Sequence, residues 1–182
     1  RVEETCSNCG VPQIRINGLE GQYTQILMDS RPIFSSLASV YGLEQLPAGM
    51  VDRIEVIRGG GSALYGANAI AGVVNIITKE PNRNSLSISN TSAFTGLGTY
   101  DINTSMNASV VAENQKAGIF LFGVQRNREQ YDRDEDGYSD IPHLNSTTVG
   151  FRSYFKTSDY SKITAEYHHT SEFRRGGYGI DS

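Results

Sequence analysis

The chain has 182 residues and a formal net charge of −4, with 19 glycines, ten tyrosines and no tryptophan. This length is enough for one domain with its own core, or for one domain and part of another. The glycine content and 38% hydrophobic residues favour many short strands and turns over a disordered or helical chain. No run approaches the roughly 18 apolar residues that a membrane helix needs. The sequence starts at Arg1 without a basic or apolar leader, so we expect a piece of a longer protein whose signal peptide is absent.

The first predicted element is a hairpin around two cysteines. Residues 1–5 and 13–17 are predicted as its strands, and Cys6 and Cys9 lie in the loop between them. A zinc site needs two more ligands, and the run Gly10-Val11-Pro12 blocks the helix start that a thioredoxin-like redox pair requires. We therefore predict a small structural disulfide, which suits an exported protein.

Three segments follow before the most informative stretch. Residues 23–29 contain the apolar run Ile26-Leu27-Met28, which predicts a buried strand that ends at Arg31-Pro32. Residues 34–42 are rich in small side chains and are predicted to form a loop, and residues 43–51 favour one or two helical turns.

Residues 50–81, with the sequence MVDRIEVIRGGGSALYGANAIAGVVNIITKEP, organise the chain. An alternating strand at residues 54–57 ends at three glycines, after which Ser62 is suited to cap one helical turn and Gly66 to close it in a left-handed conformation. A bend at Gly72 then leads into residues 73–78, VVNIIT, which are β-branched and almost wholly apolar. This run predicts a strand that is buried on both faces.

The run Arg58-Gly59-Gly60-Gly61-Ser62 has three other interpretations. A phosphate-binding loop needs a Gly-x-x-x-x-Gly-Lys-Ser/Thr run, or Gly-x-Gly-x-x-Gly before a long helix, and neither is present. An RNA-binding segment of the Arg-Gly-Gly type is repeated and basic, whereas this run occurs once in an acidic chain. Taken alone, the run therefore predicts a tight turn in which backbones approach closely.

The whole stretch, however, resembles the C-terminal half of the plug domain of TonB-dependent outer-membrane receptors. In that family a Glu-x-x-x-Gly-x-x-Ser-x-x-Tyr-Gly run precedes an Ile-x-Gly-x-x-Asn-Ile-x-Thr strand. Earlier in this chain, residues 14–18 and 26–32 are similar to two further segments of the plug domain. Asp29-Ser30 stands where many relatives have Asp-Gly, and Gly59-Gly60-Gly61 where Gly-Pro is frequent. The residues that match the plug motif, which we expect to be structural, are Glu55, Arg58, Gly59, Ser62, Tyr65, Gly66, Gly72 and Asn75.

The resemblance implies where a substrate would bind and what would drive its uptake. Two plug loops are expected to face the cell exterior and to contact the substrate, through Ser7, Asn8, Gly10, Val11, Pro12, Phe34 and Tyr41. The implied partners are the TonB-ExbB-ExbD energy-coupling complex, a surface lipoprotein, outer-membrane lipids and a small molecule such as a metal chelate, haem or cobalamin, but no nucleic acid. Neither plug loop contains a histidine, so nothing in the loops favours haem.

After Pro81 the pattern changes to alternating strands. Residues 101–110 place Ile102, Met106 and Val110 on one face and serine, asparagine and aspartate on the other, a period of two. The other alternating segments are residues 85–94; residues 119–126, with Phe120, Phe122 and Val124 on one side; residues 147–156, with Val149, Phe151 and Phe155; and residues 162–170, with Ile163, Ala165 and Tyr167.

Amphipathic strands of this length suit a transmembrane β-barrel, and they also suit a soluble sandwich. Short connectors near residues 113–117 and 158–161 and a long one at residues 130–145 match the short periplasmic turns and longer outer loops of a barrel. The expected fold is an α+β plug domain at residues 1–81, followed at residues 82–182 by antiparallel strands of a barrel. Five strands cannot close such a barrel, because plugged outer-membrane transporters use about 22.

The long connector contains four aspartates, Asp132, Asp134, Asp136 and Asp140, with Gly137 directly after the third. Aspartates at positions 1, 3 and 5 and glycine at position 6 resemble the start of an EF-hand loop. The match is partial, because His143 occupies position 12, where an EF-hand has a glutamate, and Arg133 adds a positive charge. Two interpretations stay open, a calcium site and a solvated acidic loop.

No other group of residues predicts catalysis. His168 and His169 are adjacent in a predicted strand, so they face opposite sides and cannot share a metal ion. No nucleophile and base pattern is present, so we expect no enzyme and no cofactor apart from calcium. The predicted function is TonB-dependent uptake of an iron-siderophore, haem or cobalamin across the bacterial outer membrane, with a plug gating the barrel lumen. The alternative is a soluble, secreted, calcium-dependent β-rich binding module.

Overall fold

A computed structural model describes residues 2–4, 12–19, 21–32, 48–66, 68–95 and 99–178. The chain divides into two compact units, Arg1–Lys79 and Glu80–Ser182. The cysteine loop and the loop with Phe34 and Tyr41 lie outside the described residues.

The first unit is a small mixed sheet with short helical turns. Its sheet has the order β4-β3-β6-β5, in which β3 and β6 are parallel and β5 runs antiparallel to β6. A separate antiparallel pair, β1 with β2, forms the predicted N-terminal hairpin. The elements are β1 (Val2–Glu4), β2 (Pro12–Ile14), η1 (Gly21–Tyr23), β3 (Thr24–Met28), β4 (Arg31–Pro32), η2 (Ala48–Met50), β5 (Val51–Arg58), α2 (Ser62–Tyr65) and β6 (Gly72–Thr78).

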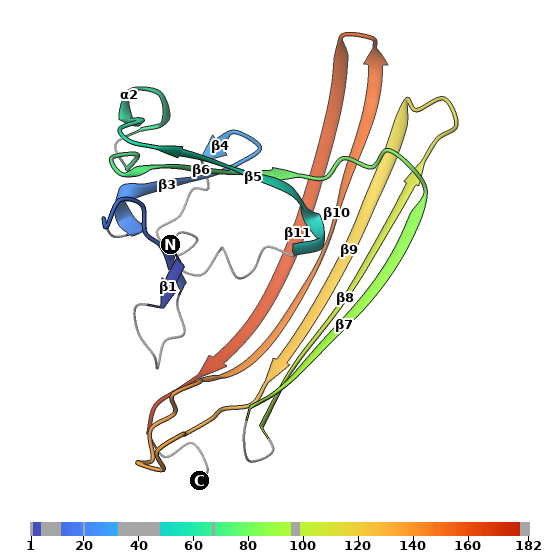
Figure 1. Cartoon of the computed structure of the whole chain (residues 1–182). Coiled ribbons are helices and arrows are strands. Elements are labelled where there is room, and N and C mark those ends of the chain that lie inside the picture. Colours follow the sequence, from blue (N-terminus) through green and yellow to red (C-terminus); the bar gives the residue numbers. More distant parts are fainter. Residues whose placement is uncertain are drawn as a thin grey trace. The chain divides into compact units, whose positions relative to one another are not determined.

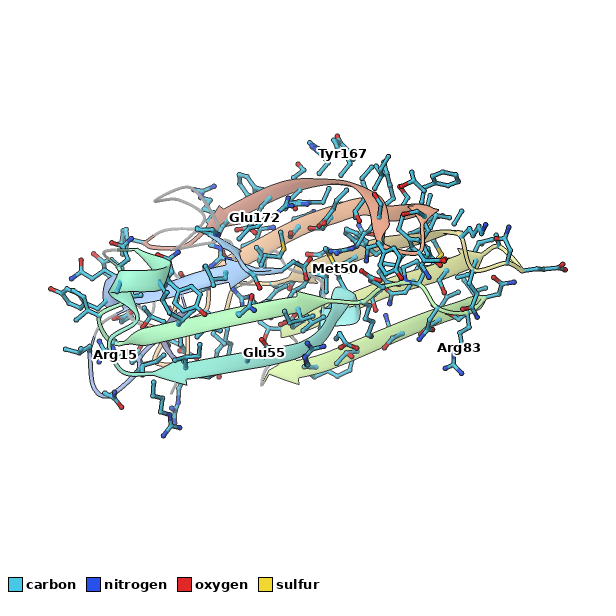
Figure 2. The ribbon with its side chains drawn as sticks, turned by 90° about the horizontal axis from the view of Figure 1, so that it is seen from above. Arg15, Met50, Glu55, Arg83, Tyr167 and Glu172 are labelled. Carbon is cyan, nitrogen blue, oxygen red and sulfur yellow. The ribbon has the colours of Figure 1, made fainter. Side chains whose placement is uncertain are left out.

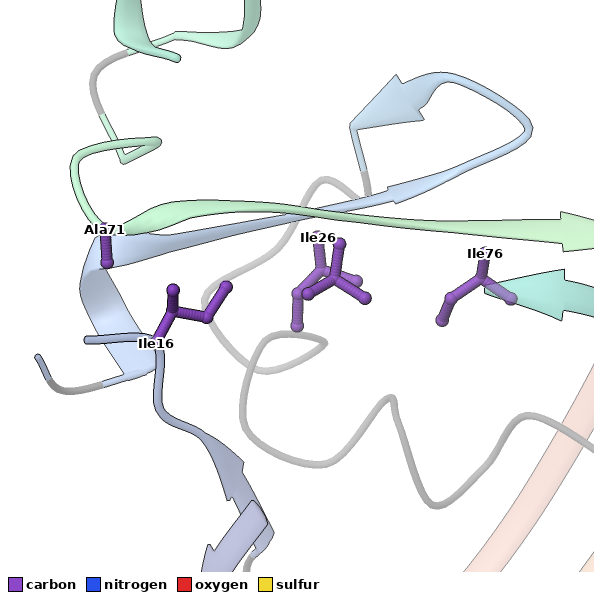
Figure 3. Close-up of a cluster of buried hydrophobic side chains, with 5 residues drawn as sticks. Ile16, Ile26, Ala71 and Ile76 are labelled. Atoms are coloured by element: carbon purple, nitrogen blue, oxygen red, sulfur yellow. The ribbon is translucent and has the colours of Figure 1, made fainter. Parts of the chain in front are cut away.

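Strand β6 is the centre of the first unit and, as its composition predicts, is buried on both faces. On one face Val74 and Ile76 pack with Ile16, Ile26 and Ala71 (Figure 3). On the other, Val73 packs with Leu27, Ala69 and the ring of Tyr65. Each fully buried aliphatic side chain contributes about 1.5–3 kcal/mol, so these two clusters are the main source of stability in this unit.

The second unit is one antiparallel sheet of five long strands in the order β11-β10-β9-β8-β7, so each strand pairs with its neighbour along the chain (Figure 1). The strands are β7 (Ser85–Thr95), β8 (Thr99–Val111), β9 (Ala117–Arg128), β10 (His143–Ser158) and β11 (Ser161–Arg175). All five extend beyond the segments predicted from alternation. Residues 112–116 and 159–160 are tight connections, whereas residues 129–142 form a long loop.

The strand register separates an apolar face from a polar face. Leu86, Ala108, Leu121, Phe151 and Tyr167 lie opposite one another in one continuous row across the sheet. The row on the other side contains Ser87, Asn107 and His168. Figure 2 shows Tyr167 projecting away from β11. These two faces are the apolar and polar faces referred to below.

The strand register shows on which face of the sheet each side of β9 lies, which alternation alone did not predict. Phe120 and Phe122 lie opposite Ser109 and Asn107 and therefore on the polar face. Ile119 and Leu121 of the same strand lie on the apolar face, opposite Val110 and Ala108. Alternation shows which residues of a strand share a side. Because β9 carries apolar residues on both sides, only its pairing with β8 reveals which side belongs to the apolar face of the sheet.

Glycines on the polar face make room for these aromatic rings. A Cβ atom on Gly150 would lie 2.5 Å from the ring of Phe122, and one on Gly118 would lie 2.6 Å from the ring of Tyr154. Gly123, on the apolar face, has its nearest neighbour at 3.9 Å. Gly118 and Gly150 therefore provide the space in which these rings lie across the strand pairs.

Candidate functional site

The glycine turn of the plug motif follows β5 and is bound by backbone hydrogen bonds to Ala69 and Ala71, just before β6. The Gly59 N–H donates to the Ala71 carbonyl at 3.0 Å and the Gly61 N–H to the Ala69 carbonyl at 2.8 Å. The Gly61 carbonyl accepts from both Leu64 and Tyr65, which closes the single helical turn. Gly59 and Gly66 both have φ +98°, a conformation that favours glycine.

Gly72 is required because two backbones meet at the start of β6. A Cβ at this position would lie 2.3 Å from the carbonyl oxygen of Ile57 and 3.1 Å from the side chain of Ile16. Gly72 pairs with Arg58, whose side chain is exposed at the end of β5. Any larger residue would push β5 away from β6.

Glu55 and Asn75 form part of a polar network that spans β5, β6 and the β3–β4 turn. The Asn75 side-chain amide donates to Glu55 Oε2 and to Ser30 Oγ, both at 3.3 Å, and Asn75 Oδ1 accepts from the Ser30 N–H at 2.9 Å. Arg53 donates to Glu55 Oε1 at 2.9 Å. The pKa of Arg53 is raised, first by its hydrogen bond to Glu55 and then by that to Asp52. Asn75 is thus satisfied in a largely buried position. Figure 2 shows Glu55 beside the β5–β6 pair.

Asp29 makes a contact that sequence reasoning missed. Its carboxylate accepts from the Thr78 N–H at 3.0 Å and from the Thr78 hydroxyl at 2.6 Å, and its own N–H donates to the Ile76 carbonyl at 2.9 Å. Asp29 and Ser30 have φ values of 47° and 65°, so the turn uses the left-handed region at two residues that are not glycine. The turn is therefore fixed to the end of β6, 49 residues away.

The predicted substrate loops stay a prediction. Of their residues only Pro12 is described, as the first residue of β2 opposite Glu4. Ser7, Asn8, Gly10, Val11, Phe34 and Tyr41 lie outside the described residues, and so do Cys6 and Cys9.

The acidic loop brings three of its four aspartates together. Carboxylate oxygens of Asp132, Asp134 and Asp136 lie within 4.8 Å of one another. Asp132 also accepts the N–H groups of Glu135 and Gly137, at 2.9 and 2.8 Å. Asp140 accepts the Arg133 N–H at 2.9 Å and is not in this group. Convergent carboxylates are the ligands that a hard cation such as calcium prefers.

The negative charges in this loop act on one another. The charge of Asp136 is the first cause of a raised pKa at Asp134, with smaller contributions from desolvation and from Asp140. A bound cation would remove this repulsion, and so would protonation.

The loop is also joined to the chain that follows β11. The Ser139 N–H donates to the Gly177 carbonyl at 3.1 Å, and the Gly177 N–H donates to Ser139 Oγ at 2.9 Å. The rings of Tyr138 and Tyr178 pack with centroids 5.1 Å apart. Residues 138–139 and 177–178 therefore prolong the β10–β11 pairing beyond the strands.

Ion pairs cross the polar face of the sheet, and the two adjacent histidines lie on opposite faces. Arg126 binds Asp101 through two hydrogen bonds of 3.0 and 2.7 Å, and Arg152 contacts Glu166 at 3.2 Å. His168 pairs with Gly150 on the polar face and His169 with Val149 on the apolar face. Among the described residues no helix is long and apolar enough to cross a membrane.

Known proteins resemble this chain in both units. The family model for the TonB-dependent receptor plug domain matches residues 2–73. A ferric enterobactin receptor of Pseudomonas aeruginosa is 44% identical over 78 residues, which is 37% of this chain and 10% of that protein. A vitamin B12 transporter, BtuB, of Vibrio cholerae is 31% identical over 141 residues, 76% of this chain and 21% of the transporter. The match to the transporter is long enough to include strands of the second unit.

The fold agrees with a solved receptor structure. The siderophore receptor PirA of Acinetobacter baumannii superposes with a TM-score of 0.74 and 23% identity, over 90% of this chain and 26% of the receptor. The matched parts thus span between about a tenth and a quarter of these relatives. Residues 2–73 thus match the TonB-dependent receptor plug domain, and the chain as a whole is similar to TonB-dependent siderophore and vitamin B12 receptors.

Proposed function

We propose that this chain is part of a receptor that takes up a scarce nutrient across the bacterial outer membrane, with the first unit as a plug in the lumen of a barrel to which the second unit contributes. On this proposal the polar face lines the lumen and the apolar face meets lipid. The resulting receptor is a transporter and not an enzyme.

The observation that carries the proposal is the contrast between the two faces of the five-stranded sheet. Ile88, Met106, Ile163 and Tyr167 on the apolar face are 50–68% exposed. A soluble protein rarely exposes a contiguous apolar surface of this kind, whereas a barrel needs one facing lipid. The ion pairs of Arg126 and Arg152 lie on the opposite face, as expected of charged side chains that face an aqueous lumen.

The size of the barrel is part of the proposal. Among the described residues β7 and β11 each pair on one side only, so the five strands form an open sheet. Unpaired backbone groups are not tolerated in lipid, which means that further strands must continue the sheet on both sides until it closes. Plugged transporters of the outer membrane have about 22 strands, and we propose the same number here.

The substrate is proposed as a metal-bearing nutrient of the iron-siderophore, haem or cobalamin class. A relative named for ferric enterobactin matches over 78 residues and one named for vitamin B12 over 141 residues, which supports the class without selecting a member. The proposed energy source is TonB with ExbB and ExbD, and a surface lipoprotein is a further proposed partner.

Uptake by the full-length receptor tests this function. Strains with and without the receptor gene would be given ⁵⁵Fe-labelled enterobactin, ⁵⁷Co-labelled cobalamin or haem as the only supply, each in a tonB-positive and a tonB-negative background. The proposal expects one substrate to accumulate only when both the receptor and TonB are present. Accumulation of none of them, or accumulation that does not need TonB, would contradict it.

The acidic loop supports a second proposal, that calcium binds there. The three converging carboxylates of Asp132, Asp134 and Asp136 are the observation that favours it. Calorimetric titration of the full-length receptor with calcium, beside the variant Asp134→Asn, tests it. A saturable heat that the variant lacks supports the site, and identical titrations would leave a solvated acidic loop. A calcium-dependent soluble module, the alternative function, also requires the protein to be monomeric in water without detergent.

A further inference from the structure

Residues 80–84 lie across the polar face of the sheet, at the end where the short connections are. They are the first residues of the second unit and lead into β7. Glu80 forms an ion pair with Lys162 at the start of β11. Pro81 is buried, and its ring lies 3.2 Å from the position of a Cβ on Gly118 in β9.

The next contacts are to β8. The carbonyl oxygen of Arg83 accepts the Ser109 hydroxyl at 2.6 Å, and Asn84 Oδ1 accepts the Val111 N–H at 2.7 Å. Ser85, the first residue of β7, then contacts the Ser109 hydroxyl at 2.8 Å. Figure 2 shows Arg83 on the segment before β7. The segment thus contacts β11, β9 and β8 in turn before it becomes β7.

These contacts differ in kind, and two of them are buried. Ser109 is 7% exposed, so releasing Arg83 would leave a buried hydroxyl without this acceptor. Pro81 packs against Gly118, where there is no room for a side chain because Tyr154 and Pro81 occupy that space. A flexible tether would show neither buried hydrogen bonds nor a packed proline. The ion pair with Lys162 is exposed and contributes little by itself.

We propose that residues 80–84 are a fixed strap that belongs to the barrel and stays bound to the sheet while substrate is transported. Any rearrangement of the plug then begins on the N-terminal side of Glu80, at Lys79. The strap sets the point at which the chain leaves the plug and so limits how far β6 can move. This inference rests on the proposed transport function, but the position of the strap does not.

A reversible cross-link tests the strap in the full-length receptor. The variant with both Glu80→Cys and Lys162→Cys would be treated in outer membranes with a short bifunctional thiol reagent that a reductant cleaves. The single variants control for reaction with Cys6 and Cys9. We expect the cross-link to form in most molecules and uptake to stay within about twofold of the untreated protein. Uptake that is lost on cross-linking and restored by reductant would overturn the proposal, and so would failure of the cross-link to form.

A second measurement does not depend on transport. Hydrogen exchange at the Val111 amide of the purified receptor should be slow, and Asn84→Ala should speed it by about tenfold because one hydrogen bond is removed. Ser87→Ala, on the same face of the sheet but outside the strap contacts, should leave that amide unchanged. Fast exchange at Val111 in the parent protein would overturn the strap. A receptor that takes up no test substrate, yet shows the cross-link and the slow amide, would contradict the transport function and leave the strap in place.

Discussion

At the scale of single residues, Ser30 combines a strained backbone conformation with a compensating side-chain hydrogen bond. Its φ of 65° lies in the left-handed region, which costs a residue other than glycine about 1–2 kcal/mol. The Ser30 hydroxyl offsets part of that cost by accepting from Asn75 at 3.3 Å. Backbone strain and a side-chain hydrogen bond therefore oppose each other at one residue.

Substituting Ser30 separates the two effects. Ser30→Ala keeps the strained backbone and loses the hydrogen bond, so it should destabilise the plug by about 1 kcal/mol. Ser30→Gly loses the same bond but relieves the strain, and should be within about 0.5 kcal/mol of the parent. Hydrogen exchange of β6 amides in the full-length receptor gives the local opening free energy of each variant. Equal values for the two variants would show that the left-handed conformation carries no cost here.

At the scale of elements, the packing of aromatic rings on glycines holds the strands of the second unit together. Gly150→Ala would place a Cβ 2.5 Å from the Phe122 ring and 2.5 Å from the Tyr167 carbonyl oxygen, and should destabilise the β9–β11 region by about 1–3 kcal/mol. Gly123→Ala is the matched control, because its nearest neighbour is 3.9 Å away. The readout is the temperature at which the receptor unfolds on a gel, and a similar shift for both variants would contradict the packing described here.

The loop at residues 129–142 should respond to pH through Asp134. Its pKa is raised in the folded loop, mainly by Asp136, so the ionised carboxylate disfavours the folded loop. This cost is present above the raised pKa and disappears as the pH falls below the ordinary value near 4. The loop amides of Tyr131 and Ile141, which donate to backbone carbonyls within the loop, should therefore exchange more slowly, relative to their intrinsic rates, at acidic pH.

Asp134→Asn should give the same protection at neutral pH, because it removes the charge without changing the size of the side chain. Asp159→Asn, in the turn between β10 and β11, is the control. If Asp134→Asn exchanged faster than the parent at neutral pH, repulsion between the carboxylates could not be the dominant force in this loop.

At the scale of the whole molecule, local patterns predicted most of the fold. The β-branched run from Val73 to Thr78 is sufficient to identify β6, and period-two alternation identifies β7 to β11. Contacts between distant segments were not predictable in this way. The hydrogen bond from Thr78 to Asp29 joins residues that are 49 positions apart. The face on which Phe120 lies depends on its pairing with Ser109 in β8. The strap is similar, because Pro81 lies beside Gly118 through the pairing of β9 with β8 and not through its position in the sequence.

The most direct test of the central claim is to fractionate membranes that contain the full-length protein and to compare its gel mobility with and without heating. A closed barrel predicts that the protein is recovered in the outer-membrane fraction and migrates faster before heating than after it. A protein that stays soluble without detergent and migrates identically in both lanes would contradict the barrel, and the calcium-dependent binding module would become the better account.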